Sequence, residues 1–383
     1  MRIAERSDIL KFLDPTNKFE ELKKFVDSKW DYNPQFTYST DHVSILKEVS
    51  VYVNKLKTRA LKLKTNDGIK QLMIEKCDEI LCKFNLLAAY HYQDFDKILA
   101  LNTQLFGKLE DYTTPSLNYS KLENNFWLSY ESLFEKTGIT IAETLTQKQV
   151  KELLVYHTQS IGFASYSIQF GNFGNTNMQV RIGPKPVIYT HKKDSYKTFD
   201  VCVSILHEVY GHLLRYKNGI DSDYHILQGG TAYYLSTEEG IAVFQAARIE
   251  GFEKTRARLT KSYEYFPQAG LLSWKELTKL YIKNGRTNLE SIFWSILRLK
   301  RGIEDTSAVH SGTVFYKDKV YIDWYYSILT YFINQLTNTN QVKSKEWMKK
   351  SINKLFLDDI IMIWRIKVED IEKIPCIWDA TQV

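Results

Sequence analysis

Two histidines bracket a glutamate in the segment from His207 to His212, inside a run at 199–216 that reads as a buried helix. Neutral imidazoles bind zinc, and a carboxylate beside them can activate a water molecule. Because the whole chain contains only 8 His, we interpret the pattern as a metal site, with His207 and His212 as ligands and Glu208 as general base. The alternative is a core helix with two hydrogen-bonded histidines.

The spacing of these histidines makes a structural demand. The common zinc motif places its histidines four residues apart, on one face of an α-helix, whereas His207 and His212 are five apart. At about 100° per residue, their rings are roughly 140° out of phase in a regular helix. Binding one ion therefore requires a π-bulge, which widens the helix and occurs mostly at functional sites. Gly211 relaxes the backbone there at low steric cost.

A third ligand is expected from the acidic pair at 238–239, near the start of another helix. Ser236 and Glu239 also fit a capping box, in which Glu239 serves only the start of the helix. Glycine inside a helix costs roughly 1 kcal/mol and usually has a packing or functional reason, so Gly240 favours a functional interpretation. We expect Glu239 as the third ligand and Glu238 as a residue that holds a histidine N–H. The reverse assignment of the two glutamates stays open.

Both motifs resemble those of the QEGLA-motif family, which includes the microtubule-associated tyrosine carboxypeptidase and many bacterial members. The letters are HEVYGH at 207–212 and EEGIAV at 238–243. Weaker similarity extends over about residues 30–325, in NPQFTY at 33–38, LLRYKNG at 213–219, Arg301-Gly302, and Lys317-Asp318 with Tyr321. Glu238 stands where the family motif has Gln, so the hydrogen bonding around the metal is expected to differ.

The resemblance implies a zinc-dependent carboxypeptidase that holds one Zn²⁺ through His207, His212 and Glu239. Such an enzyme removes one residue, tyrosine or another aromatic, from the C-terminus of a peptide or protein. Glu208 would take the proton of the attacking water and pass it to the leaving amine.

Cleavage at a C-terminus also requires a cation that binds the terminal carboxylate. Arginine can bind a carboxylate through two hydrogen bonds, and lysine acts as a point charge. Arg301 and Lys317 are the candidates, because they lie in the outer family elements. His310 or Tyr321 could stabilise the oxyanion.

Two other functions remain open. HEVYGH with a later Glu-Glu pair is also similar to dipeptidyl peptidase III, whose motif is HELLGH, although its Glu-Glu element lies much farther along the chain. Release of dipeptides from an N-terminus would favour that function. The other is a non-catalytic metal-binding regulator, as the naming of bacterial family members suggests. It would bind metal but leave peptides with free ends intact.

Composition and charge argue against several other classes of protein. The 383 residues carry a formal charge of +6 with no clustered basic stripe, which argues against nucleic acid as a partner. No apolar run approaches 18 residues, and the first residues lack the apolar core of a signal peptide. The four cysteines show no paired CxxC spacing, so no disulfide framework is indicated. We expect a cytoplasmic protein without a membrane span.

The periodicity predicts an α+β fold that is mainly α-helical, with a helical N-terminal region at 1–125 and a catalytic region at 126–383 in one continuous unit. A small sheet is expected within 162–189, beside the metal-binding helix of a zincin-like metallopeptidase core. An edge strand there could receive the substrate backbone, or the sheet could serve packing alone. Helices are expected at about 252–264, 273–283, 288–300, 324–337 and 344–355, and a short strand pair at 313–316 and 320–322.

Overall fold

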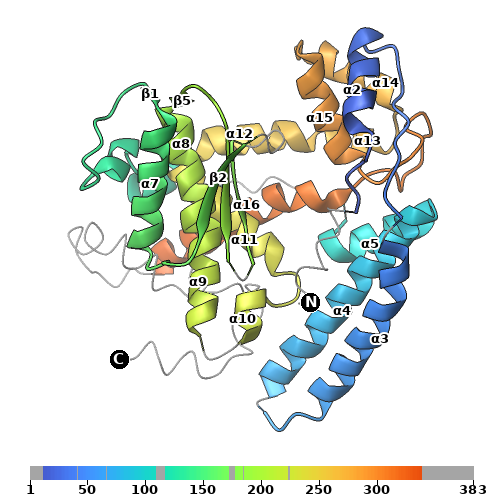
Figure 1. The fold of residues 1–383 in the computed structure, drawn as a ribbon, viewed down its shortest axis with the longest axis horizontal. Helices are drawn as coiled ribbons and strands as arrows, with labels where there is room; N and C mark the ends of the chain where they lie inside the picture. The colour runs from blue at the N-terminus through green and yellow to red at the C-terminus, as the bar shows by residue number, and fades with distance from the viewer. Residues whose placement is uncertain are drawn as a thin grey trace. The chain divides into compact units, whose positions relative to one another are not determined.

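The computed structural model describes residues 12–40, 42–65, 67–108, 117–171, 177–183, 185–222 and 225–338. The described chain is mainly helical with small β-sheets, which confirms the expected α+β, mainly α-helical composition (Figure 1). It divides into two compact units that are each discontinuous in sequence. Among the described residues, unit 1 comprises 12–108 and 260–320, and unit 2 comprises 117–259 and 321–338. No helix in these ranges is both long enough and apolar enough to span a membrane.

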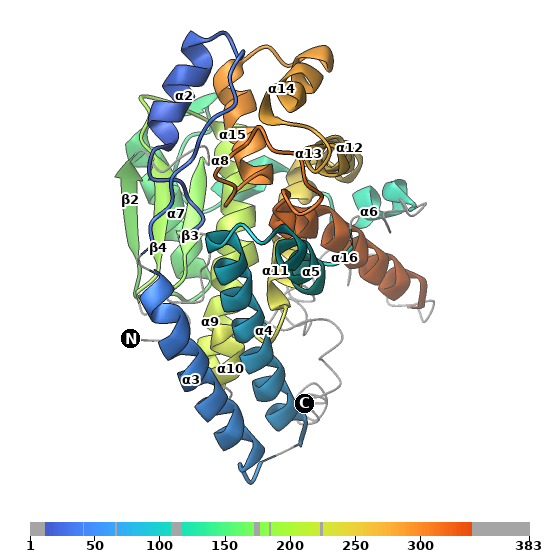
Figure 2. The same cartoon turned by 90° about the vertical axis from the view of Figure 1, so that its right-hand side faces the viewer.

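Unit 1 is helical. Its elements are α2 (Lys18–Asp27), α3 (His42–Leu61), α4 (Asp67–His91), α5 (Phe95–Phe106), α13 (Tyr265–Ala269), α14 (Trp274–Lys283), α15 (Leu289–Leu299) and the 3₁₀ helix η4 (Tyr316–Asp318). Helices α3 and α4 form a long pair joined by a short turn (Figure 2). Their apolar residues recur three and four apart, so Val49 and Val53 pack against Ile80 and Phe84.

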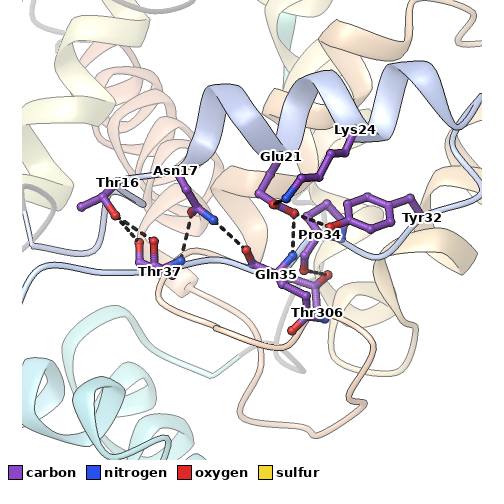
Figure 3. Close-up of polar contacts among 9 residues, drawn as sticks. All are labelled: Thr16, Asn17, Glu21, Lys24, Tyr32, Pro34, Gln35, Thr37 and Thr306. Atoms are coloured by element: carbon purple, nitrogen blue, oxygen red, sulfur yellow. Dashed lines mark hydrogen bonds and ion pairs between the residues drawn. The ribbon is translucent and has the colours of Figure 1, made fainter.

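The segment 33–38, one of the outer elements with family resemblance, lies along α2 and is fixed by side-chain hydrogen bonds (Figure 3). The buried Glu21 carboxylate accepts a 2.8 Å hydrogen bond from the Gln35 N–H. The Asn17 amide donates to the Gln35 carbonyl at 2.8 Å and accepts from the Thr37 N–H at 3.0 Å. These hydrogen bonds satisfy backbone groups of an extended segment that pairs with another strand only through an isolated β-bridge among the described residues.

The same segment also contacts the second outer element, which follows Arg301. The Tyr38 hydroxyl accepts from the Gly302 N–H at 3.0 Å and donates to the Ile303 carbonyl at 3.2 Å. The Thr306 hydroxyl donates to the Pro34 carbonyl at 2.7 Å (Figure 3). Two sequence elements more than 260 residues apart therefore support one another within unit 1.

Unit 2 combines helices with two small sheets. Its elements are α6 (Tyr119–Phe126), η2 (Tyr130–Phe134), β1 (Thr144–Leu145), α7 (Gln147–Ser160), β2 (Ser167–Gly171), β3 (Met178–Arg181), β4 (Val187–His191), β5 (Tyr196–Lys197), α8 (Thr198–Ile205), the π-helix η3 (Leu206–Leu213), α9 (Leu214–Asp221), α10 (His225–Gly229) and α11 (Tyr234–Glu250). Helices α12 (Phe252–Tyr263) and α16 (Lys319–Asn338) begin in one unit and end in the other.

The three-stranded sheet has the order β2-β4-β3, with β4 parallel to β2 and antiparallel to β3. Strand β3 is therefore an edge strand. One hydrophobic core joins the sheet to α7 and to the helix that carries the histidine motif, through residues such as Ile188, Leu154 and Val209, all with 0% exposure. A sheet beside the motif helix was expected, and the structure confirms it.

The expected strand pair at 313–316 and 320–322 is wrong. Tyr316–Asp318 is a 3₁₀ helix that leads directly into α16, and the Phe315 N–H bonds the Leu299 carbonyl at 2.7 Å instead of a strand. The apolar stretches were too short for periodicity to separate a strand from the first turn of a helix. The helix expected at 344–355 lies outside the described residues.

Candidate metal centre

The histidine motif lies in a π-helix, as the five-residue spacing predicts. Residues 198–221 form one helical run, in which α8 and α9 are regular and Leu206–Leu213 is the π-helix η3. The wider i→i+5 turn brings residues five apart to the same side. The ring centroids of His207 and His212 accordingly lie 5.1 Å apart.

Gly211 allows α11 to pack directly on the π-helix. A Cβ atom at Gly211 would meet both Cα and Cβ of Ala242 at 2.7 Å, closer than real Cβ contacts occur. The same approach brings the Ala242 backbone into a hydrogen bond with the His207 ring. Gly240, on the other side of α11, would meet the Trp324 backbone at 2.8 Å. Both glycines are thus explained by close packing rather than by backbone freedom alone.

Glu239 faces both histidines from α11. Its Oε2 atom lies 3.6 Å from Nε2 of His212 and 3.9 Å from Nε2 of His207. This oxygen is buried and has no hydrogen-bond partner among the described residues. An unsatisfied carboxylate oxygen is unfavourable in a protein interior, and a cation between the three atoms would satisfy it.

The ligand atoms of His207, His212 and Glu239 all lie within 4.8 Å of one another, so the group could hold a metal ion. Zinc with bonds of about 2.1 Å in tetrahedral geometry has ligand atoms roughly 3.4 Å apart. The distances from Glu239 Oε2 to Nε2 of His212 and of His207, 3.6 and 3.9 Å, are only slightly longer. Two nitrogens and one carboxylate oxygen also match the donor set of catalytic zinc sites. The residues present therefore fit the ion.

Ser236 and Glu239 do not form the capping box that their spacing allows. Helix α11 begins at Tyr234, earlier than Ser236, and the residue before it makes no side-chain cap. Ser236 and Glu239 therefore both lie inside the helix, where Glu239 is only 6% exposed.

Glu238 binds the other side of the second histidine. Its Oε1 atom lies 3.0 Å from Nδ1 of His212, and its Oε2 atom lies 3.7 Å from a guanidinium nitrogen of the fully buried Arg215. The Nδ1–H of His212 donates to Glu238, so Nε2 faces Glu239 and is the nitrogen that can bind a metal ion.

Glu208 lies next to the ligand set and is held by the edge strand. Its Oε1 atom lies 4.0 Å from Nε2 of His207, and its Oε2 accepts a 2.8 Å hydrogen bond from the Val180 N–H on β3. Burial raises the pKa of this carboxyl group to about 7, although its hydrogen bond and the nearby His212 act in the opposite direction. A carboxyl group with a pKa near neutrality is suited to accept and donate a proton.

The two histidines differ in their protonation. Burial lowers the pKa of His207 to about 3, and the charge of His212 adds to this effect. Burial also disfavours the charged form of His212, but the hydrogen bond to Glu238 and the charge of Glu239 outweigh it and raise its pKa to about 9. His212 is therefore protonated at neutral pH when no metal is bound, and a metal ion that binds it must displace this proton.

Tyr210 anchors the π-helix on another side. Its hydroxyl lies 2.9 Å from Nδ1 of His157 on α7 and 3.2 Å from the Ser160 hydroxyl. The second ring nitrogen of His157 donates to the Leu133 carbonyl at 2.9 Å. His157 is thus a packed histidine with a partner at each ring nitrogen.

The expected substrate-binding residues fall in different units. Arg301 and Lys317 belong to unit 1, where both lie near Asp318 and, after Arg298, help to lower the pKa of this carboxyl group against the effect of its burial. Arg298 pairs with Asp318 at 2.6 Å. The Nε atom of Arg301 is buried without a hydrogen-bond partner in the described ranges.

The two candidates for oxyanion stabilisation are also separated by the division into units. His310 is exposed in unit 1 and stacks on Phe95 with ring centroids 4.5 Å apart. Tyr321 is the first residue of the second segment of unit 2 and lies on α16.

Sequence reasoning missed three groups at this centre: Arg215, the Val180 N–H and Tyr210. Arg215 follows His212 by three residues on the same helix, and that spacing was the signal for a shared face. The Val180 contact comes from a backbone group, which no residue type reveals.

A buried centre with two histidines and a glutamate, beside a second glutamate on a π-helix, is typical of a hydrolytic metalloprotein. The profile of the microtubule-associated tyrosine carboxypeptidase family matches residues 23–264, more than half of the chain, and the chain belongs to this family. The resemblance seen in the motifs is thereby confirmed. No curated protein matches the chain.

Proposed function

We propose that this protein is a zinc-dependent carboxypeptidase, which removes a C-terminal tyrosine or other aromatic residue from a peptide or protein. The observation that carries the proposal is the unsatisfied Oε2 of Glu239 between the Nε2 atoms of His207 and His212, with Glu208 alongside. Family membership supports the class of reaction. A zincin-like core, with an active-site helix packed on a sheet, is part of the same proposal.

His207, His212 and Glu239 would hold the zinc ion. Bound zinc supplies Lewis acidity, which polarises a carbonyl and makes water a better nucleophile. Glu208 takes a proton from the water molecule as the water oxygen bonds the scissile carbonyl carbon. Glu208 then gives this proton to the leaving amine as the C–N bond breaks. Burial raises the pKa of Glu208 to about 7, so it can serve as base and as acid near neutral pH.

The edge strand β3 is the proposed docking place for the substrate backbone. Val180 directs its N–H to Glu208 rather than to β4, so the neighbouring edge of the sheet faces the same carboxylate. An extended peptide that adds to this edge brings its peptide bonds toward Glu208. Substrate position and general base would thus depend on one strand.

Arg301 and Lys317 are proposed to bind the terminal carboxylate of the substrate. Together with Arg298 they place three cations near the carboxylate of Asp318. Tyr321 is proposed to donate a hydrogen bond to the oxyanion. Replacing Arg301 or Lys317 by Gln is expected to raise KM for peptides with a free C-terminus.

The test combines metal analysis with a peptide library that has free or amidated C-termini. Wild-type protein is expected to contain one zinc per chain and to release single C-terminal residues, preferentially aromatic ones. Glu208→Gln is expected to keep the zinc and to lose activity by about 10²–10⁴-fold, and a chelator is expected to abolish activity.

Other outcomes would point to the competing functions. Release of dipeptides from free N-termini would favour a peptidase similar to dipeptidyl peptidase III. Zinc-loaded protein that leaves every free-ended peptide intact would indicate a metal-binding regulator. Protein that binds no zinc at micromolar concentrations would contradict the proposal.

A further inference from the structure

Arg215 is a buried cation that contacts the metal centre through the side chain of Glu238. It lies in the first turn of α9, directly after the π-helix, and its side chain is 0% exposed. One of its terminal guanidinium nitrogens is 3.7 Å from Oε2 of Glu238. The other oxygen of that carboxylate, Oε1, is 3.0 Å from Nδ1 of His212.

The two oxygens of Glu238 therefore have different partners, one cation and one imidazole. A buried carboxylate without a counter-charge is strongly unfavourable, and removing one member of a buried ion pair leaves the other uncompensated. Arg215 places a positive charge beside the Glu238 carboxyl group, which is only 2% exposed. Contact with Arg215 also restricts rotation of the carboxylate about its last side-chain bond.

We infer that Arg215 is a positioning residue of the metal centre, which orients His212 through Glu238. The fixed carboxylate accepts the Nδ1–H of His212, and this selects the tautomer whose Nε2 lone pair faces Glu239. Partners of this kind typically change metal affinity by 10–100-fold. This inference rests on the proposed function, because it concerns the ligands of the same zinc ion.

The chemistry of the pair explains why the residue types at 215 and 238 depend on each other. Glutamine at 238 would have one acceptor oxygen, needed for the Nδ1–H of His212, and would turn its NH₂ group toward a guanidinium that can only donate. Glu238→Gln therefore leaves Arg215 facing another donor. Conversely, Arg215→Met removes a buried positive charge beside Glu238.

The test measures zinc affinity by chelator competition, on variants shown to be folded by circular dichroism. Arg215→Met and Glu238→Gln are each expected to weaken zinc binding by about 10–100-fold. The double variant is expected to lose much less than the product of the two single losses, because Arg215 acts through Glu238. Losses that simply multiply would overturn the inference.

Arg248→Met is the matched control. Arg248 is also buried in unit 2, at 5% exposure, and it donates hydrogen bonds to the Phe126 carbonyl and to the Gln245 side chain. Its variant is expected to lower the melting temperature without changing zinc affinity.

A second substitution at position 215 covers the case in which Arg215→Met does not fold. Arg215→Lys keeps the charge but loses the planar fork, and it should bind zinc more weakly than wild type. Unchanged zinc affinity in the folded Arg215 variants would refute the positioning role and leave the proposed function standing. Failure of the wild-type protein to bind zinc would instead contradict the proposed function and the inference together.

Discussion

Gly211 on the π-helix and Ala242 on α11 are in direct backbone contact, since a Cβ atom at Gly211 would lie 2.7 Å from both Cα and Cβ of Ala242. Helix α11 also carries Glu239, one turn before Ala242. The missing side chain at residue 211 therefore sets the distance between the carboxylate and the two imidazoles. The π-helix aligns the histidines, and the glycine brings the third ligand to them.

Gly211→Ala is expected to weaken zinc binding as well as the fold. The added methyl group must push α11 away from the π-helix, and overpacking of this kind typically costs about 1–3 kcal/mol of stability. Gly229→Ala is the control, because a Cβ atom there meets nothing within 4 Å. Denaturant unfolding and chelator competition measure the two effects. Equal behaviour of the two variants would show that close packing at residue 211 is unimportant.

How much of this centre can be predicted from sequence depends on how far apart in the chain the contacting residues lie. The five-residue spacing predicts the π-helix, because only a widened turn places His207 and His212 together. The hydrogen bond from Val180 to Glu208 joins residues 28 apart, and the contact of Tyr210 with His157 joins residues 53 apart. Such contacts depend on how the sheet and α7 pack, which local patterns do not specify.

The start of α11 and the outer family elements illustrate the same limit. Ser236 matches a capping box, yet the helix begins two residues earlier, at Tyr234, so Ser236 lies inside it. In the sequence, the segment at 33–38 shows only a weak family resemblance. Its hydrogen bonds to residues after Arg301 could not be read from a single sequence.

Zinc affinity is expected to rise with pH between about 6 and 9. The pKa of His212 is raised to about 9 in the metal-free protein by Glu238 and Glu239, against the effect of burial, so below pH 9 the bound proton competes with the metal. One displaced proton predicts about a tenfold gain in affinity per pH unit. Competition titrations with a chelator corrected for its own protonation measure this slope. A flat profile would contradict the proton competition at His212.

Acid is expected to destabilise the protein through His157. Burial lowers the pKa of His157 to about 4, below its ordinary value of 6.5. Its contribution to stability is therefore complete above pH 6.5 and is lost as the pH falls through 4, because the unfolded chain binds the proton more readily. The full effect is about 3 kcal/mol for a shift of this size.

Urea unfolding at several pH values, with His157→Gln, tests the role of this histidine. The variant is expected to be less stable at pH 7 and to show a shallower loss of stability between pH 6.5 and 4 than wild type. His310→Gln, at an exposed position, is the control and should follow the wild-type profile. Parallel curves for wild type and His157→Gln would exclude His157 as the source of acid sensitivity.

Tyr38→Phe is expected to destabilise unit 1 without altering zinc affinity. The hydroxyl of Tyr38 accepts from the Gly302 N–H and donates to the Ile303 carbonyl, so its removal leaves both backbone groups without this partner. Loss of these bonds should cost about 1–3 kcal/mol. Tyr92→Phe removes a hydroxyl from a side chain with 71% exposure and should have little effect. A Tyr38→Phe variant with wild-type stability but weaker zinc binding would assign the outer family element to the metal centre rather than to the fold of unit 1.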